Sequence, residues 1–242
     1  AVSIGPSSGG SAFSASLGSA NCSHCSSRAP ATKAYERYLQ QYPQPLEPAI
    51  EARARLARLA GQDGNAAAAL AWQRQVLQAD QAAGAARTDR TRFLGASAAL
   101  ALAEPVYAEY RKVALVEPLQ KQLKLKKARM EETLKAYAVA SDYGVADVST
   151  AATYRVASIY QDFGRALLGS ERPRKLSKAE LEQYNVLLEE QAFPFEEKAT
   201  ELHELNARRA ADGIYDASVR ASFKALAELR PLRYGKTERG EE

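Results

Sequence analysis

Residues 31–80 read ATKAYERYLQQYPQPLEPAIEARARLARLAGQDGNAAAALAWQRQVLQAD, and this stretch decides the fold class. It is rich in Ala, Leu, Glu, Arg and Gln, which favour helices. It lacks the alternation of β-branched and polar residues that is typical of strands. Bulky residues recur at helical spacing, as in Tyr35, Tyr38 and Leu39 between Ala31 and Pro43. The same composition continues down the chain, so the sequence predicts an all-α protein.

Within this stretch, small and large residues are spaced as in a helix–turn–helix unit. Leu56 and Ala57 suit the close contacts of a first helix, and Gly64 suits the turn. The second helix carries Ala69, Trp72, Val76, Leu77 and Asp80. Helices approach closely only where small side chains allow it. The pattern resembles the 34-residue tetratricopeptide repeat (TPR), although Arg53 and Ala60 stand where that family prefers large aromatic residues. The resemblance implies a right-handed array of helical hairpins, an α-solenoid; an irregular helical bundle is the alternative.

Prolines and capping residues predict where helices begin and end. Three Glu-Pro pairs each precede an amphipathic run, and proline suits the first position of a helix. The pairs are Glu47-Pro48, Glu104-Pro105 and Glu117-Pro118. Ser177 and Glu180 have the spacing of a capping box, and Gly213 is placed to end the helix that they begin. Gly164 is expected in a turn of a degenerate repeat over residues 150–168, and residues 91–110 resemble a second degenerate repeat.

The C-terminal half predicts one long helix. Apolar residues fall on one face between residues 177 and 212, which requires a partner helix. They are Leu181, Tyr184, Leu188, Ala192, Phe195, Ala199 and Leu202. Pro194 interrupts this run, and we expect it to bend the helix.

The chain divides by composition into four parts. They are a disordered leader over 1–30, TPR-like repeats over 31–90, a degenerate TPR-like region over 91–236 and a charged tail over 237–242. The leader holds ten Ser and four Gly, and such a segment buries too little apolar surface to fold. It has neither the basic start nor the apolar run of a signal peptide, so we interpret it as a spacer.

Four strings carry a more particular resemblance. They are KKARMEETLKAY (126–137), YGVADVSTAATYRVASIY (143–160), ALLGSERP (166–173) and LEEQAFPFEEKATELHELNARRAADGIYD (188–216). They resemble the C-terminal region of proteobacterial envelope TPR proteins, which are encoded beside TonB/ExbB/ExbD-type and gliding-motility-like components. Over residues 93–236 this resemblance implies a scaffold in the periplasm or associated with the outer membrane; the cytoplasm is the alternative location.

Charge is segregated along the chain, although the total is only +4. Residues 111–135 hold eight bases and three acids, and residues 178–204 hold eight acids and two bases. We expect the two segments to pack antiparallel against each other. The alternatives are a basic face for an acidic partner, for nucleic acid or for anionic lipids, with peripheral membrane association. No aromatic residues alternate with the lysines between 120 and 129, so a nucleic-acid partner is not expected.

Motifs for catalysis or metal binding are not found. Cys22, His24 and Cys25 lie close together, but a structural zinc site normally needs four ligands. His203-Glu204 begins like a zinc-protease motif, yet Ala207 occupies the place of the second histidine. The sequence therefore predicts no enzyme activity, no cofactor and no metal.

The predicted function is a non-catalytic scaffold or adaptor that binds protein segments in a bacterial cell-envelope complex. Its concave surface would recognise peptides or partner domains. The candidate protein-binding residues are Gln75, Tyr107, Tyr110, Tyr154, Lys121, Lys124, Lys126 and Lys127. The alternative is a helical enzyme or regulator that acts on cell-wall or lipid substrates, in a cleft beside Phe193 with His203 and a carboxylate.

Overall fold

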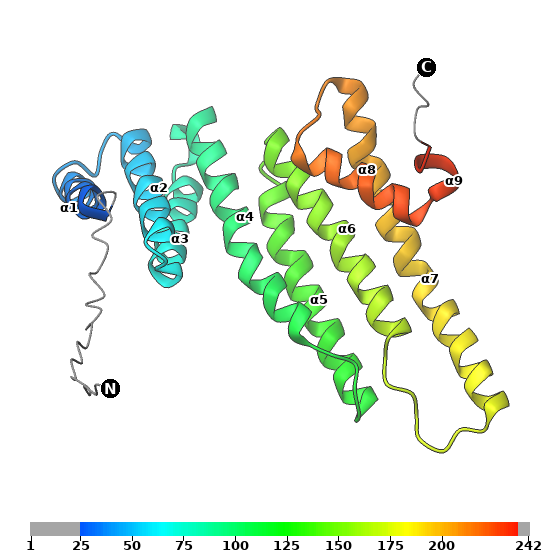
Figure 1. The fold of residues 1–242 in the computed structure, drawn as a ribbon. Coiled ribbons are helices and arrows are strands. Elements are labelled where there is room, and N and C mark those ends of the chain that lie inside the picture. The colour runs from blue at the N-terminus through cyan, green and yellow to red at the C-terminus, as the bar shows by residue number, and fades with distance from the viewer. Residues whose placement is uncertain (1–24, 237–242) are drawn as a thin grey trace, which may run out of the picture.

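The computed structural model describes residues 25–236, and this part of the chain is helical with no strand (Figure 1). The α-helices are α1 (Cys25–Gln41), α2 (Leu46–Gln62), α3 (Ala66–Ala82), α4 (Asp89–Lys112), α5 (Leu119–Ser141), α6 (Ala146–Leu168), α7 (Lys178–Arg208), α8 (Ala217–Leu229) and α9 (Pro231–Tyr234). Two short 3-10 helices are η1 (Gly84–Ala86) and η2 (Arg209–Asp212). The all-α prediction is confirmed. None of the described helices has the length and apolar character needed to cross a membrane.

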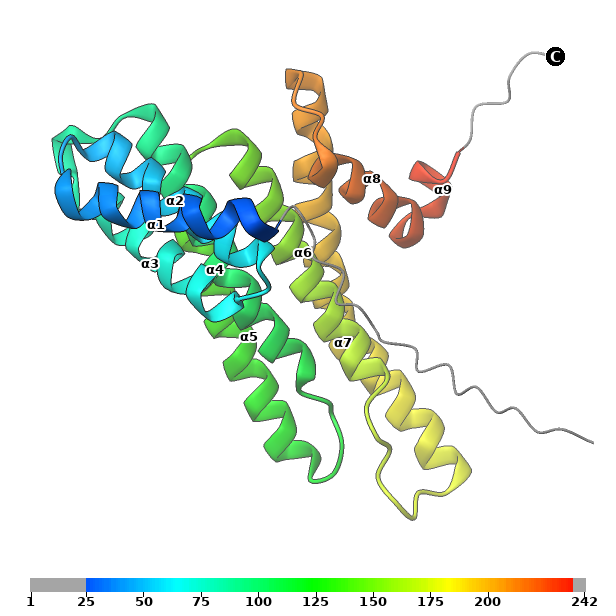
Figure 2. The same cartoon turned by 60° about the vertical axis from the view of Figure 1, so that its left-hand side comes forward.

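Consecutive helices form antiparallel hairpins. Figures 1 and 2 show α2 beside α3, α4 beside α5, and α6 beside the long α7. Gly64 makes the turn between α2 and α3 with a φ of 75°, as the repeat spacing predicts, and Gly144 makes the turn between α5 and α6 with a φ of 67°. Positive φ is strained for residues with a Cβ atom, so glycine suits both turns.

The hairpins are stacked so that the even-numbered helices form one layer. α2 contacts α4, α4 contacts α6, and α6 contacts α8. The odd-numbered helices are farther apart. α3 makes at most a marginal contact with α5, and α5 makes at most a marginal contact with α7. The even-numbered helices are therefore closer together than the odd-numbered ones, which are splayed apart.

Small residues in α4 allow this close packing. Ala96, Ala98 and Ala103 are fully buried there. The main core extends across α4–α7 and contains Tyr110, Tyr137 and Phe163 at 0% exposure. The backbones approach because methyl groups occupy the contact positions, and aromatic rings fill the adjacent spaces.

Two of the predicted helix boundaries are wrong. Pro105 lies inside α4 instead of starting a helix, at an exposed position. Gly164 lies inside α6, where a Cβ atom would be 3.5 Å from the Glu196 side chain of α7. This is an ordinary van der Waals distance, so the site would also accommodate an alanine, and Gly164 makes no turn. Residues 91–110 and 150–168 each belong to a single helix.

Other boundaries are confirmed. Ser177 caps α7: the Glu180 N–H donates to its Oγ at 3.3 Å, and the Ser177 N–H donates to Glu180 Oε2 at 2.7 Å. Gly213 follows η2 with a φ of 79°. α7 is one helix of 31 residues that includes Pro194. α1 begins at Cys25, within the stretch expected to be a leader; the rest of that leader, residues 1–24, and the charged tail lie outside the described residues.

Candidate functional site

An open cleft lies where α3, η1, the start of α4 and the end of α5 meet. It has a volume of 470 Å³. Its lining residues are Gln81, Arg87, Arg92, Val139, Asp142 and Tyr143. We call it the arginine cleft, because its lining includes two guanidinium groups, those of Arg87 and Arg92, and only one carboxylate, that of Asp142.

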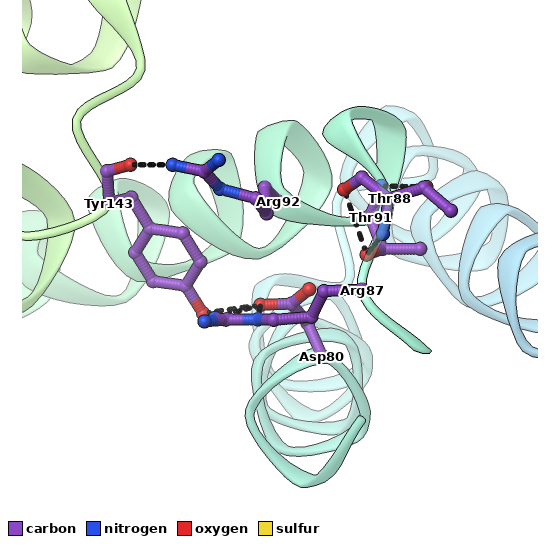
Figure 3. Close-up of polar contacts among 6 residues, drawn as sticks. All are labelled: Asp80, Arg87, Thr88, Thr91, Arg92 and Tyr143. Carbon is purple, nitrogen blue, oxygen red and sulfur yellow. Dashed lines mark hydrogen bonds and ion pairs between the residues drawn. The ribbon is translucent and has the colours of Figure 1, made fainter. Parts of the chain in front are cut away.

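Asp80, at the end of α3, holds Arg87 in place. The Asp80 side chain is fully buried, and its Oδ2 accepts hydrogen bonds from Arg87 Nε at 3.1 Å and Arg87 Nη2 at 2.5 Å (Figure 3). Tyr143 Oη donates to the same oxygen at 2.8 Å. The Arg87 guanidinium also lies 5.0 Å from the centre of the Tyr143 ring, within cation–π range. Arg87 is thus oriented by a carboxylate and an aromatic ring together.

The site requires a glycine in α4. A Cβ atom at Gly95 would lie 2.7 Å from Asp80 Oδ2 and 2.8 Å from Tyr143 Oη. Such distances are shorter than van der Waals contact between carbon and oxygen. The Asp80–Tyr143 hydrogen bond therefore runs directly over the backbone of Gly95, and a residue with a Cβ atom would force these side chains to move.

Arg92 is fixed by the backbone of the turn after α5. Its Nη2 donates to the carbonyl oxygen of Tyr143 at 3.1 Å (Figure 3). The start of α4 is set by a reciprocal cap in which the Thr91 N–H donates to Thr88 Oγ1 at 3.2 Å and the Thr88 N–H donates to Thr91 Oγ1 at 3.1 Å. The cap places Arg87 just before the helix and Arg92 in its first turn.

The electrostatics of the cluster keep Arg87 charged and Tyr143 protonated. The hydrogen bond to Asp80 raises the pKa of Arg87 above its usual value. Burial, together with the hydrogen bond to Asp80, raises the pKa of Tyr143 to about 12. Among the described residues, Arg87 Nη1 makes no hydrogen bond. The side chain of Arg92 is 48% exposed, and its Nη1 lies 3.9 Å from the fully exposed carboxylate of Asp89, a long ion pair. Guanidinium groups with donors directed to an open cleft can bind a carboxylate or another oxyanion.

Three of the residues predicted to bind protein are buried instead. Tyr110 is fully buried, and its Oη donates to the Ile159 carbonyl at 3.0 Å. Tyr107 is 8% exposed and stacks on Tyr110. Lys126 is 4% exposed, and its Nζ donates to the Val113 carbonyl at 2.9 Å, beyond the end of α4. These three belong to the core, so the prediction that they form a binding surface is wrong.

The other candidates lie on the surface of three different helices, and only the three lysines are close to one another. Gln75 is exposed on α3, and Tyr154 is half-buried on α6. Lys121, Lys124 and Lys127 are exposed on α5. None of them lines the arginine cleft.

The expected packing between the two charged segments is also wrong. α5 carries most of the basic segment and α7 carries the acidic one, and each packs against α6. α6 therefore separates the two helices.

His203 lies in the core between α7 and α8. It is fully buried, its Nδ1 is 3.3 Å from Ser222 Oγ, and its ring lies 5.6 Å from that of Tyr154. Burial lowers its pKa to about 4, so it is neutral at physiological pH. It does not line the hollow beside Phe195, near the predicted cleft, and Nδ1 contacts the Ser222 hydroxyl and no carboxylate.

The cysteine motif is only partly within the described residues. Cys22 and His24 lie outside them, and Cys25 is the first residue of α1. Between residues 25 and 236, no three His, Cys, Asp or Glu side chains are grouped so that they could hold a metal ion.

Sequence reasoning missed Arg87, Arg92 and Tyr143. One signal was present: Asp80 lies one turn after Val76 on the apolar face of its helix, and a buried carboxylate needs a cation or several donors. Arg87 was the nearest arginine following it. Tyr143 is 63 positions away, and no local pattern indicates that contact.

Compared with protein-family models, with curated proteins and with solved structures, the chain gives no match. Function is therefore inferred from the helices and the cleft themselves.

Proposed function

We propose that this chain is a non-catalytic scaffold that binds protein segments through an array of TPR-like hairpins, and that the arginine cleft recognises a carboxylate of its partner. The carboxylate would be an Asp or Glu side chain or a chain terminus. The observation that carries the proposal is the pair of arginines at an open cleft, oriented by contacts with buried residues.

The arrangement of the helices supports a binding role. Stacked hairpins with a continuous layer of even-numbered helices present an extended surface, which repeat proteins use to recognise partners. The hairpin α2–α3 has the predicted repeat spacing, with Leu56 and Ala57 buried and Gly64 in the turn. These features favour an α-solenoid of the TPR type over an irregular bundle.

The orientation of Arg87 supports recognition of a carboxylate. Because Asp80 and Tyr143 already hold the guanidinium, binding would immobilise little additional side-chain freedom. Arg92 is held by a backbone carbonyl at the same cleft. Charge-assisted bidentate hydrogen bonds of this kind are among the stronger polar contacts in proteins.

The proposed setting is a protein complex of the bacterial cell envelope, in the periplasm or at the outer membrane. The support is the resemblance of residues 93–236 to envelope TPR proteins. Under this proposal the partner is a component of the same complex.

Site-specific crosslinking tests the proposal. A photoreactive amino acid at Val139, which lines the cleft, should crosslink to a discrete envelope protein in cells. The same group at Leu232, which is 92% exposed on α9, should not give this adduct. Arg92→Glu should abolish the adduct at position 139.

Arg174→Glu provides the matched control, because Arg174 is exposed in the loop between α6 and α7 and changes the net charge equally. It should leave the adduct intact. An adduct that survives Arg92→Glu, or that forms equally well at positions 139 and 232, would show that the cleft does not bind the partner.

A further inference from the structure

A small apolar hollow lies among α5, α6 and α7, away from the arginine cleft. Figure 1 shows α6 between the other two helices, and all three contribute to the walls. The hollow has a volume of 140 Å³. Most of its lining is apolar and includes Leu119, Leu123, Phe163, Leu167, Leu188 and Phe195.

The hollow has a closed end and an open end. Ser170 and Leu115 are buried and lie at the same end, because the N–H of Glu171 donates to the Leu115 carbonyl at 2.9 Å. Lys127 lies in the third turn of α5 and is exposed, as is Gln191 of α7. The hollow is therefore closed beside Ser170 and open beside Lys127.

The closed end contains a hydroxyl group without a partner. Ser170 is 6% exposed, and its Oγ makes no hydrogen bond with any of the residues that the structure describes. An unpaired buried hydroxyl is costly, and native structures rarely leave one. A polar atom of a bound molecule at this end would provide the missing partner.

The open end carries a positive charge. The ion pair that α5 makes within the described part of the chain joins Arg129 and Glu132, which leaves the Lys127 ammonium available. Lys124 lies on the adjoining surface of α5, where Glu131 is the single acidic lining residue. The mouth of the hollow therefore suits an anionic group.

The volume limits the size of the ligand. An apolar cavity of about 150 Å³ lined by Leu, Ile and Phe binds one benzene ring. A hollow of 140 Å³ accepts a single ring or a short alkyl chain in the same way. Pockets for larger ligands measure about 300–1,000 Å³, so a long acyl chain or a nucleotide is too large.

We propose that this hollow binds a small carboxylic acid, with its ring or short alkyl chain inside, its carboxylate at Lys127 and a hydrogen-bonding group at Ser170. Leucine and phenylalanine side chains remove the apolar part from water, and the ammonium pairs with the carboxylate. Aromatic hydroxy acids combine these three groups. The site is separate from the arginine cleft, and this inference goes beyond the proposed scaffold function.

Calorimetric titration with 3-(4-hydroxyphenyl)propionate tests the proposal. The dissociation constant should be about 1 mM or lower. Lys127→Gln removes the charged partner of the carboxylate and should weaken binding at least about fivefold. Leu123→Trp places a larger side chain in the wall and should abolish binding.

Two related compounds test the polar contacts. 3-Phenylpropionate lacks the ring hydroxyl, so it should bind about fivefold more weakly, and Ser170→Ala should not change its affinity. The same variant should weaken binding of the hydroxylated acid about fivefold. Tyramine keeps the ring and hydroxyl but carries an amine in place of the carboxylate, so it should not bind.

Matched variants provide the controls. Lys121→Gln makes the same change in charge at an exposed position of α5 outside the hollow and should bind as the unaltered chain does. Arg92→Glu should also leave the affinity unchanged, which separates this site from the arginine cleft. Circular dichroism confirms that each variant is helical.

Three results would overturn the proposal. The first is the absence of saturable binding at millimolar concentrations of the hydroxylated acid. The second is binding that persists unchanged in Lys127→Gln or Leu123→Trp, because the ligand would then lie elsewhere on the chain. The third is equal affinity of the unaltered chain for the two acids, because Ser170 would then not take part.

Discussion

Replacing Gly95 with alanine probes the Asp80 cluster directly. In an ordinary helix this change stabilises the protein by about 1 kcal/mol, because alanine is the better helix former. At position 95 the new methyl group would lie 2.7 Å from Asp80 Oδ2 and 2.8 Å from Tyr143 Oη. Both oxygens must move, and Asp80 is fully buried with little room to do so.

The size of the effect follows from the bonds that the methyl group displaces. Hydrogen bonds to a charged group contribute about 1.5–3 kcal/mol each. Displacing Asp80 or Tyr143 breaks the bond between them and strains the pair formed by Asp80 and Arg87. After subtracting the gain in helix propensity, we expect Gly95→Ala to lower the free energy of unfolding by about 2 kcal/mol.

Urea unfolding followed by circular dichroism measures this loss. Gly61→Ala is the matched control, because Gly61 lies inside α2 and a Cβ atom there meets nothing within 4 Å. That variant should be as stable as the unaltered chain or slightly more stable. In a Tyr143→Phe background the contact with the hydroxyl is absent. Gly95→Ala should therefore lower the free energy of unfolding by less than it does in the unaltered chain.

A Gly95→Ala variant as stable as the Gly61→Ala variant would refute this reasoning. Equal losses in the presence and absence of the Tyr143 hydroxyl would do so as well. The first result would mean that Asp80 and Tyr143 are not held against the backbone of α4, and the second that the Tyr143 hydroxyl takes no part in the clash.

Two further predictions concern buried ionisable groups. Burial lowers the pKa of His203 to about 4, against about 6.5 in an unfolded chain, so below pH 6.5 the unfolded state binds a proton that the native state does not. Stability should fall by about 2 kcal/mol between pH 7 and pH 5 in urea titrations, and His203→Gln should remove that part of the slope. Lys126→Met leaves the carbonyl oxygen of Val113 without its donor and should lower the free energy of unfolding by about 2 kcal/mol. Lys124→Met, at an exposed position, should change it by less than about 0.5 kcal/mol.

Local chemistry made the helices predictable. Ser177 and Glu180 act within three residues of each other, so their spacing alone indicates the start of α7. The predicted helix start at Pro105 and turn at Gly164 were wrong, because the role of each residue depends on its surroundings in the fold and not on its neighbours in the sequence. Pro105 lies inside α4, where its ring is exposed to solvent, and Gly164 lies inside α6, on the face that packs against α7.

The candidate site was much less predictable, because it depends on contacts between distant residues. Lys124, Lys126 and Lys127 look alike in the sequence, yet Lys126 is in the core and the other two are exposed. Arg87 and Tyr143 have no motif, and they acquire a shared role only when α3 and the turn after α5 are brought together.

The contact between Tyr143 and Asp80 also has a consequence for how the chain folds. In stacked repeats each hairpin contacts mainly its neighbours, so unfolding can start at an end and stop at a weak interface. Here one buried carboxylate joins α3 to a residue 63 positions later, across α4. Its formation requires closing a long loop, and that entropy is lost before the bond can form. The α2–α3 hairpin also packs directly on α4, so this bond adds a second connection across α4, and unfolding of either partner removes an interaction that the other needs.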